Sequence, residues 1–314
     1  MVIANKPNTI IESSNKDIAD ITQGSPVVQA KANTAVVITH YADPFSPYSR
    51  GFQSVLARLQ AVYGHQLRVD YKMGGMARTV SQWIDEAGLR EDSVAQWVNG
   101  VIDQTQNPVD PNFIANTGVK TTWVGALAFT AAAKHDQQRA VRLLRRMIEA
   151  FQIESMPANR TTIAKLADEV GLNGEQIVRE SFYESTISEF AWQRNAMGRS
   201  ELSLSQLAIK VGDNEVFISD SFDATDYERA IDELAPGLKK AESKDALSYI
   251  SDLEGNVISV KEISDVFGIS NSESQRQLDR FTESGFLLSS EIGETNIWKI
   301  TTSGAVDTNL KHAS

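Results

Sequence analysis

The segment DPFSPYS (residues 43–49) follows an apolar, β-branched run at residues 35–39 and opens a helical pattern. We expect the run to be a buried parallel strand, because such strands lack polar alternation. Ser46 suits the N-cap of the following helix, and Pro47 suits its first turn. The segment therefore predicts a strand-to-helix turn that carries two serines separated by two residues.

The turn belongs to a strand-helix-strand unit. Apolar residues at helical spacing predict a helix over 48–63, which ends at Gly64, a residue suited to a helix C-terminus. Alternating apolar residues predict a strand over 66–73. Because such units cross over right-handed, we expect the two strands to lie parallel in one sheet.

A long helical region separates this unit from two further strands. Glycine and proline breaks divide residues 76–198 into several helices, and a turn at 212–214 predicts a hairpin. The order predicts an α/β domain with an inserted helical subdomain. The expected helices are 79–88, 91–105, 122–134, 136–153, 161–170, 174–196 and 226–235, and the expected strands are 202–211 and 215–219.

The C-terminal part predicts a second unit. Its pattern indicates three helices followed by a pair of strands across Gly293. This layout is typical of a winged helix-turn-helix. The expected helices are 246–253, 260–267 and 272–284, and the expected strands are 286–288 and 296–300.

These patterns divide the chain into five parts. We expect flexible tails at both ends, because neither shows sustained periodicity. The expected parts are a tail at 1–33, an α/β domain at 34–76 and 199–240, a helical insertion at 77–198, a winged-helix-like domain at 241–306 and a tail at 307–314.

The amino-acid composition limits which reactions and ligands the chain can support. The chain has no cysteine, four scattered histidines and a net charge of −11. These counts exclude disulfides and thiolate metal sites, and they predict no metal centre. The acidic balance opposes binding to nucleic acid or to anionic membranes. Because no apolar stretch is long enough to span a bilayer and no signal-like segment begins the chain, we expect a cytoplasmic protein.

Particular residues carry a family resemblance. The segment 41–76, with Asp43-Pro44, Tyr63-Gly64 and Gly74-Gly75-Met76, resembles the DsbA-like thioredoxin-fold proteins. Within them it is most similar to the cytoplasmic branch of FrnE-type proteins and Spx-degradation adaptors. Residues 121–123 (TTW) and 166–172 (LADEVGL) resemble the inserted helical subdomain of the same group. The resemblance covers about residues 34–240 and implies a thioredoxin-like fold.

The resemblance also implies a site. It places the redox pair of the family at Ser46 and Ser49, and it implies substrate-binding positions at Pro47, Tyr48 and Trp123. A serine hydroxyl does not undergo disulfide exchange, so this chain lacks the thiol chemistry of the family. The replacement of both thiols is either natural or engineered.

The opposite side of the expected site is also changed. The family has a cis-proline at the start of the strand that faces the redox pair. We assign Ser205 to that position, because no proline occurs between Pro157 and Pro236.

One alternative keeps chemistry at the turn. Ser46-Pro47-Tyr48 resembles the motif of kappa-class glutathione transferases and 2-hydroxychromene-2-carboxylate isomerases. In those enzymes the serine hydrogen-bonds the thiolate of glutathione, and a helix N-terminus favours such an anion. This alternative predicts a glutathione-dependent transferase or isomerase; otherwise no cofactor is required.

Two binding hypotheses remain. In the first hypothesis the chain is a binding or regulatory protein that acts as a protein adaptor or a ligand sensor. Its ligand is a protein partner or a small thiol, and a homodimer is compatible with this role. The second is a DNA-binding regulator that uses Arg276 and Arg280 of the third C-terminal helix. Residues 245–303 contain four basic and ten acidic residues, which disfavours contact with phosphates. We therefore favour the first hypothesis.

Overall fold

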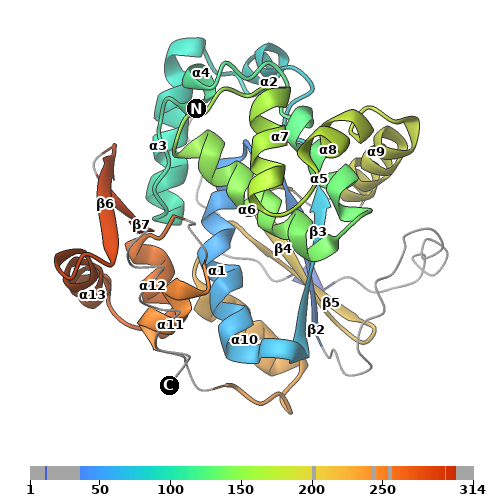
Figure 1. Cartoon of the computed structure of the whole chain (residues 1–314). Helices are drawn as coiled ribbons and strands as arrows, with labels where there is room; N and C mark the ends of the chain where they lie inside the picture. Colours follow the sequence, from blue (N-terminus) through green and yellow to red (C-terminus); the bar gives the residue numbers. More distant parts are fainter. Residues whose placement is uncertain are drawn as a thin grey trace.

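A computed structural model of the chain describes residues 11–12, 36–199, 203–241, 245–253, 257–293 and 295–301 (Figure 1). A mixed sheet in the order β1-β5-β4-β2-β3 forms the centre. β2 and β3 are parallel, as the strand-helix-strand pattern predicts, and the other neighbouring pairs are antiparallel. The strands are β1 (Ile11–Glu12), β2 (Val36–Ala42), β3 (Leu67–Met73), β4 (Gln206–Val211) and β5 (Asn214–Ser219).

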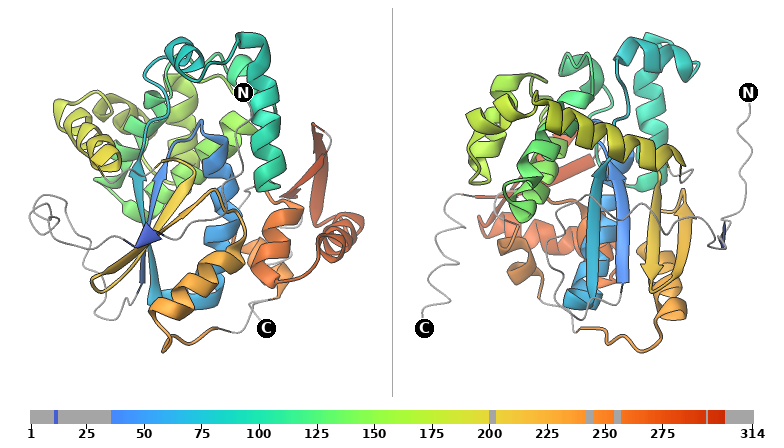
Figure 2. Two further views of the ribbon diagram at one scale, coloured as in Figure 1. Left: turned by 180° about the vertical axis from the view of Figure 1, so that it is seen from behind. Right: turned by 90° about the vertical axis from the view of Figure 1, so that its right-hand side faces the viewer.

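Helix α1 (Pro47–Tyr63) is the central helix of the molecule. Its apolar residues, among them Phe52 and Leu59, pack with α10 (Ala224–Leu234) against one face of the sheet (Figure 2). α12 (Val260–Phe267) packs against α1 from the side away from the sheet. Because partners lie on several sides of α1, even polar residues such as Ser54 are buried.

The helical subdomain covers one end of the sheet. α5 is apolar around its circumference, as expected of a helix surrounded by other helices. α9 reaches the end of β3, where the Gln193 side chain accepts a hydrogen bond from the backbone N–H of Met73 at 2.7 Å. The helices are α2 (Val80–Glu86), α3 (Val94–Thr105), α4 (Phe113–Asn116), α5 (Trp123–Ala133), α6 (Gln137–Gln152), α7 (Arg160–Glu169), α8 (Gly174–Glu180) and α9 (Glu184–Arg199), with short 3₁₀ turns at η1 (Gly64–Gln66) and η2 (Glu91–Ser93).

The single helix expected over 174–196 is divided in two. A turn at residues 181–183 separates α8 from α9. The buried Ser181 hydroxyl donates to the carbonyl of Ile177 at 2.7 Å, a local bond of the kind that competes with helix continuation. Phe182 and Tyr183 are exposed at the corner that results.

The C-terminal unit contains the three helices and two strands that the sequence predicts. Its small core gathers around Ile263, Leu278 and Trp298. Within the tails, the short strand β1 is described, whereas residues 302–314 lie outside the described residues. The elements are α11 (Ala246–Ser251), α12, α13 (Asn271–Glu283), β6 (Leu287–Ile292) and β7 (Thr295–Ile300).

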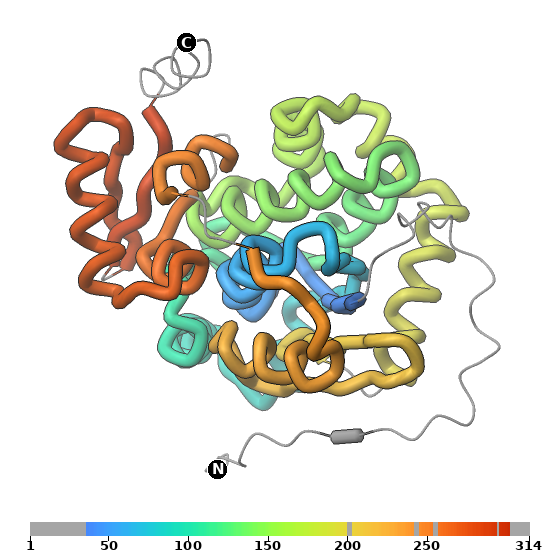
Figure 3. Tube along the Cα trace, turned by 90° about the horizontal axis from the view of Figure 1, so that it is seen from below, coloured from blue at the N-terminus to red at the C-terminus, as the bar shows by residue number. Residues whose placement is uncertain are grey.

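A buried ionic network joins this unit to the α/β body. Arg145 on α6 donates to both carboxylate oxygens of Glu262 on α12, at 3.0 and 3.1 Å, and to the carbonyl of Val257 at 3.0 Å. Its Nε atom also donates to Glu149 at 3.0 Å. Figure 3 shows the C-terminal unit lying beside α1 and α6, where these contacts form.

We expect Glu262→Ala to lower the free energy of unfolding by about 3 kcal/mol, the lower end of the range for a broken buried pair, because Arg145 loses its bidentate partner and keeps Glu149 as a carboxylate partner. Urea denaturation measures the change. Asp92→Ala is the control: it breaks an ion pair with Arg90 whose side chains are 80% and 63% exposed, and exposed pairs contribute at most about 1 kcal/mol. Equal effects of the two substitutions would contradict a structural role for the network.

Candidate functional site

The turn at residues 43–49 is organised by the carboxylate of Asp43. One oxygen accepts the backbone N–H of Phe45 at 2.7 Å, and the other accepts the N–H of Met76 and the Thr122 hydroxyl, both at 2.6 Å. These bonds join the turn to the segment after β3 and to the start of α5. Asp43 is fully buried, and burial raises its pKa to about 6 although the hydrogen bonds oppose the shift.

Ser46 is fully buried inside the molecule. It occupies the N-cap of α1, as its sequence context predicts, but its side chain makes no capping hydrogen bond. The residue is 0% exposed, and its hydroxyl has no hydrogen-bond partner in the structure. The end of α6 covers the turn: Gln152 donates to the carbonyls of Pro44 and Ser46 at 2.8 and 3.0 Å, and Phe151 stacks on Phe45 at 4.5 Å.

Ser49 is also buried, and its hydroxyl accepts the backbone N–H of Asp43 at 3.0 Å. The two serines of the expected redox pair therefore have different surroundings. The Ser49 hydroxyl helps to close the turn, whereas the Ser46 hydroxyl has no hydrogen-bond partner.

The other expected site residues have separate packing partners. Pro47 is buried in the first turn of α1. Tyr48 stacks on Phe222 at 5.9 Å between ring centroids. Trp123 lies beneath the guanidinium of Arg194, 4.6 Å from the ring centroid. The structure thus directs Tyr48 and Trp123 into different contacts instead of joining them around Ser46.

Ser205 precedes β4 and lies in a local turn. Its hydroxyl is 3.0 Å from that of Ser203. The antiparallel register pairs His40 with Leu207, so the residues before β4 lie alongside the end of β2. Within the described residues no peptide bond is cis.

The two arginines proposed for DNA contact lie on α13. Arg276 donates to Glu273 on the same helix at 3.1 Å and is thereby partly neutralised. Arg280 lies in the last turn of α13 and is exposed.

A cavity of about 150 Å³ opens between α1, α6 and the sheet. Ser49, which is fully buried, reaches its wall from the turn, and the exposed side chains of Gln60 and Arg142 mark its mouth. The residues that line the cavity are His40, Ser49, Gln53, Leu56, Ala57, Gln60, Tyr71, Val141, Arg142, Leu144, Arg145 and Ile148.

His40 is one of the cavity residues that the sequence pattern did not identify as part of a site. The parallel register places it beside Tyr71 on the face of the sheet that carries α1. It is 2% exposed, and neither ring nitrogen has a hydrogen-bond partner. Burial lowers the pKa of His40 to about 3, so the imidazole is neutral at physiological pH. The sequence signal that could have pointed to His40 was a histidine within the largely apolar run that forms β2.

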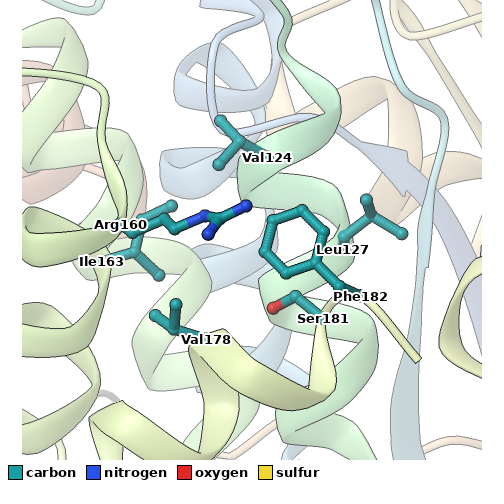
Figure 4. Close-up of a pocket in the computed structure, with 7 residues that line it drawn as sticks. All are labelled: Val124, Leu127, Arg160, Ile163, Val178, Ser181 and Phe182. Carbon is teal, nitrogen blue, oxygen red and sulfur yellow. The ribbon is translucent and has the colours of Figure 1, made fainter.

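A second depression lies between α5, α7 and α8 (Figure 4). Arg160 covers the ring of Phe182 at 4.1 Å. The enclosed volume is about 10 Å³, which is the space of one water molecule. This depression is therefore too small for an organic ligand.

Within the described residues, no group of three or more histidine and acidic side chains could hold a metal ion. In the same part of the chain, no helix has the length and apolar character needed to cross a membrane.

The family model described as Thioredoxin matches residues 40–198, just over half of the chain. The chain belongs to this thioredoxin family. The match confirms the predicted thioredoxin-like fold with its helical insertion. Because this member of the family has no cysteine, it has no thiol of its own. A search of curated proteins finds no match.

Two solved structures with a TM-score above 0.5 support the fold. The cytosolic disulfide reductase DsbM from Pseudomonas aeruginosa is 21% identical, with a TM-score of 0.51 over 63% of this chain and 97% of that chain. A proposed protein disulfide isomerase from Nitrosomonas europaea is 16% identical, with the same TM-score and coverage. A 2-hydroxychromene-2-carboxylate isomerase is 16% identical, with a TM-score of 0.45 over 63% of this chain and 95% of that chain.

We expect a cysteine at position 46 to be unreactive in the folded protein, because that side chain has no solvent exposure. The parent chain lacks cysteine, so Ser46→Cys reports on one position alone. Labelling with a thiol-specific disulfide reagent should be on the order of 100-fold slower than for Ser81→Cys on the exposed surface of α2, and equal for both in denaturant. Comparable native rates would show that the turn is open.

The raised pKa of Asp43 predicts a pH-dependent stability. A native pKa of about 6 against 3.8 means that the folded state binds the proton more tightly. The stabilisation from the protonated form is present below about pH 4 and is lost as pH rises through 6, a change of about 3 kcal/mol. Urea denaturation of the parent and of Asp43→Asn at each pH measures the difference. The free energy of unfolding of the parent minus that of Asp43→Asn should fall between pH 4 and 6. If this quantity stays constant or grows, the pKa of Asp43 is not raised.

Proposed function

We propose that this chain is a thiol-independent member of the thioredoxin family that acts by binding, as a protein adaptor or ligand sensor. The burial of Ser46 carries this proposal. A glutathione-dependent enzyme needs the Ser46 hydroxyl within reach of a ligand thiolate, and Gln152 and Phe151 close that approach. The redox pair of the family is replaced, and the turn has become part of the core.

We further propose that residues 245–301 form a winged-helix module that contacts a protein partner. The module contacts the body through α12 and through the strand pair, where Ile292 and Ile297 pack with Ile153, whereas α13 lies at the outer side (Figure 1). The outer surface of α13 mixes charges, since Glu273 and Asp279 alternate with Arg276 and Arg280. Such a surface suits a protein partner better than a run of phosphates.

An exposed leucine marks where that partner would bind. Leu288 on β6 is 64% exposed, the largest exposure among the described large hydrophobic residues. A partner that covers this side chain would remove its apolar surface from water, which favours association. The proposed role resembles that of the adaptor-type cytoplasmic members of the group and differs from that of the reductases.

A photo-crosslinking amino acid at position 288 of the full chain tests the binding role. We expect discrete crosslinked products, identified by mass spectrometry, in an extract of the source cells. The same amino acid at position 81, which is exposed on α2, provides the matched control and should give no product in common.

Two results would support the alternatives instead. Calorimetric binding of glutathione that Ser46→Ala weakens would indicate chemistry at the turn. Retention of DNA in a gel at low salt, lost in the Arg276→Ala plus Arg280→Ala variant, would indicate a DNA-binding regulator. Either result, without crosslinks from position 288, would overturn the proposal.

A further inference from the structure

The outer face of α9 is exposed along the length of the helix. The opposite face packs on the body: Thr186 and Phe190 are buried, and Gln193 accepts the backbone N–H of Met73. The residues of the outer face recur at the three- and four-residue spacing that places side chains on one side of a helix. The exposed residues of this face include Glu184, Ile187, Ser188, Ala191, Asn195 and Arg199.

Exposed apolar side chains gather at the start of this face. Among the described residues, the large hydrophobic side chains that are exposed are Phe182, Tyr183, Ile187 and Leu288. The first three lie within one helical turn and a half of one another, at the corner between α8 and α9 and on the outer face of α9. Arg160 covers one side of the Phe182 ring, yet Phe182 remains 46% exposed (Figure 4). Removal of such groups from water favours association, so this corner marks an interaction surface.

The two ends of the outer face carry opposite charges. Glu184 lies in the first turn of α9 and Arg199 in its last turn, and both are exposed. At a rise of about 1.5 Å per residue, these two residues are about 22 Å apart along the helix axis. They are therefore too far apart to form an ion pair within one chain.

A second copy of α9 in the antiparallel direction complements this face. When two copies meet at a two-fold axis near Ala191, Glu184 of each copy lies opposite Arg199 of the other. The same register sets Ser188 opposite Asn195, and their side chains can form a hydrogen bond. Ala191 of both copies lies at the centre, where small side chains allow two helices to approach closely. A parallel arrangement would instead place like charges together.

We propose that the protein forms a two-fold dimer through α9, with the two helices antiparallel and Glu184 of each copy paired with Arg199 of the other. Such a symmetric contact closes on itself and limits the assembly to two copies. A contact of one helix per chain is small among protein interfaces, so the dimer is weak and depends on concentration.

The dimer leaves the C-terminal units accessible. In Figures 1 and 3, α9 and the C-terminal unit lie on opposite sides of the body. Leu288 on β6 therefore stays exposed in both copies, and one dimer carries two partner-binding modules. This inference goes beyond the proposed function and does not depend on the partner surface.

Sedimentation equilibrium of the full chain over a range of concentrations tests the dimer. Glu184→Arg and Arg199→Glu each place like charges opposite one another, and each should weaken dimerisation at least about tenfold. Because the chain has a net charge of −11, the change of net charge in Glu184→Arg would by itself favour association. Glu233→Arg, the same substitution at an exposed position of α10, is the matched control and should leave the dissociation constant within about twofold.

The exchanged variant, Glu184→Arg plus Arg199→Glu, separates pairing across the dimer from the stability of α9. It restores opposite charges between the two copies, so its dissociation constant should return to within about threefold of the parent value. It also puts both charges at the unfavourable ends of the helix dipole. If the single substitutions act only through the stability of α9, the exchanged variant will dimerise least of all, and the proposal fails.

A cysteine at the centre of the face tests the arrangement of the helices. The parent chain lacks cysteine, so Ala191→Cys contains a single thiol. Under mild oxidation it should form a disulfide-linked dimer at least about tenfold faster than Ser81→Cys on the exposed surface of α2, at the same concentration. Equal rates would overturn the proposed register.

A chain that stays monomeric at every concentration, or a dimer that Glu184→Arg leaves unchanged, overturns the proposal. Crosslinks from position 288 would in that case still support the binding function. The two ideas therefore fail separately.

Discussion

The guanidinium of Arg145 is the constraint on which the arrangement of the two units depends. Burial opposes its charge, but Glu262 and Glu149 hold its pKa above its usual range. Glu262 is held in turn by Arg145, by Arg50 and by a hydrogen bond of 2.7 Å from the Tyr249 hydroxyl. Buried ion pairs contribute little net stability compared with apolar packing, but they are costly to break and tolerate one geometry. The network therefore specifies how the C-terminal unit sits on α1 and α6 more than it adds to overall stability.

A second constraint acts at the turn. Once no thiol has to meet a substrate, the strand-to-helix turn can be closed, and here Asp43, Ser49 and Gln152 use their polar atoms to satisfy its backbone. The hydroxyl of Ser46 has no partner and no exposure, so it retains neither the reactivity of a thiol nor the benefit of a cap. The replacement of the redox pair and the closure of the turn are consistent with each other. Together, these two changes make the end of the fold that carries the redox pair in the family a structural contact in this chain.

Local pattern was sufficient for most of the elements and insufficient for the site. The apolar spacing of α1, the alternation of β3 and the Gly268 stop of α12 each act within a few residues, and all three elements formed where predicted. Closure of the turn instead depends on Gln152, which lies more than one hundred residues from Ser46 in the chain. The position of His40 depends on the register that pairs it with Tyr71 and on which face α1 covers. Contacts of that range are set by tertiary packing, which periodicity does not encode.

The cavity and the ionic network share one residue, and this has a physical consequence. An unfilled space beside an unpartnered imidazole lowers stability twice at one location, because the lining loses dispersion contacts and His40 loses hydrogen bonds. Replacement of His40 by leucine and of Ala57 by a larger residue would remove both losses. Native proteins retain unsatisfied buried polar groups mainly where function requires them. Arg145 lines the same cavity and binds Glu262, so its side chain connects the cavity wall to α12.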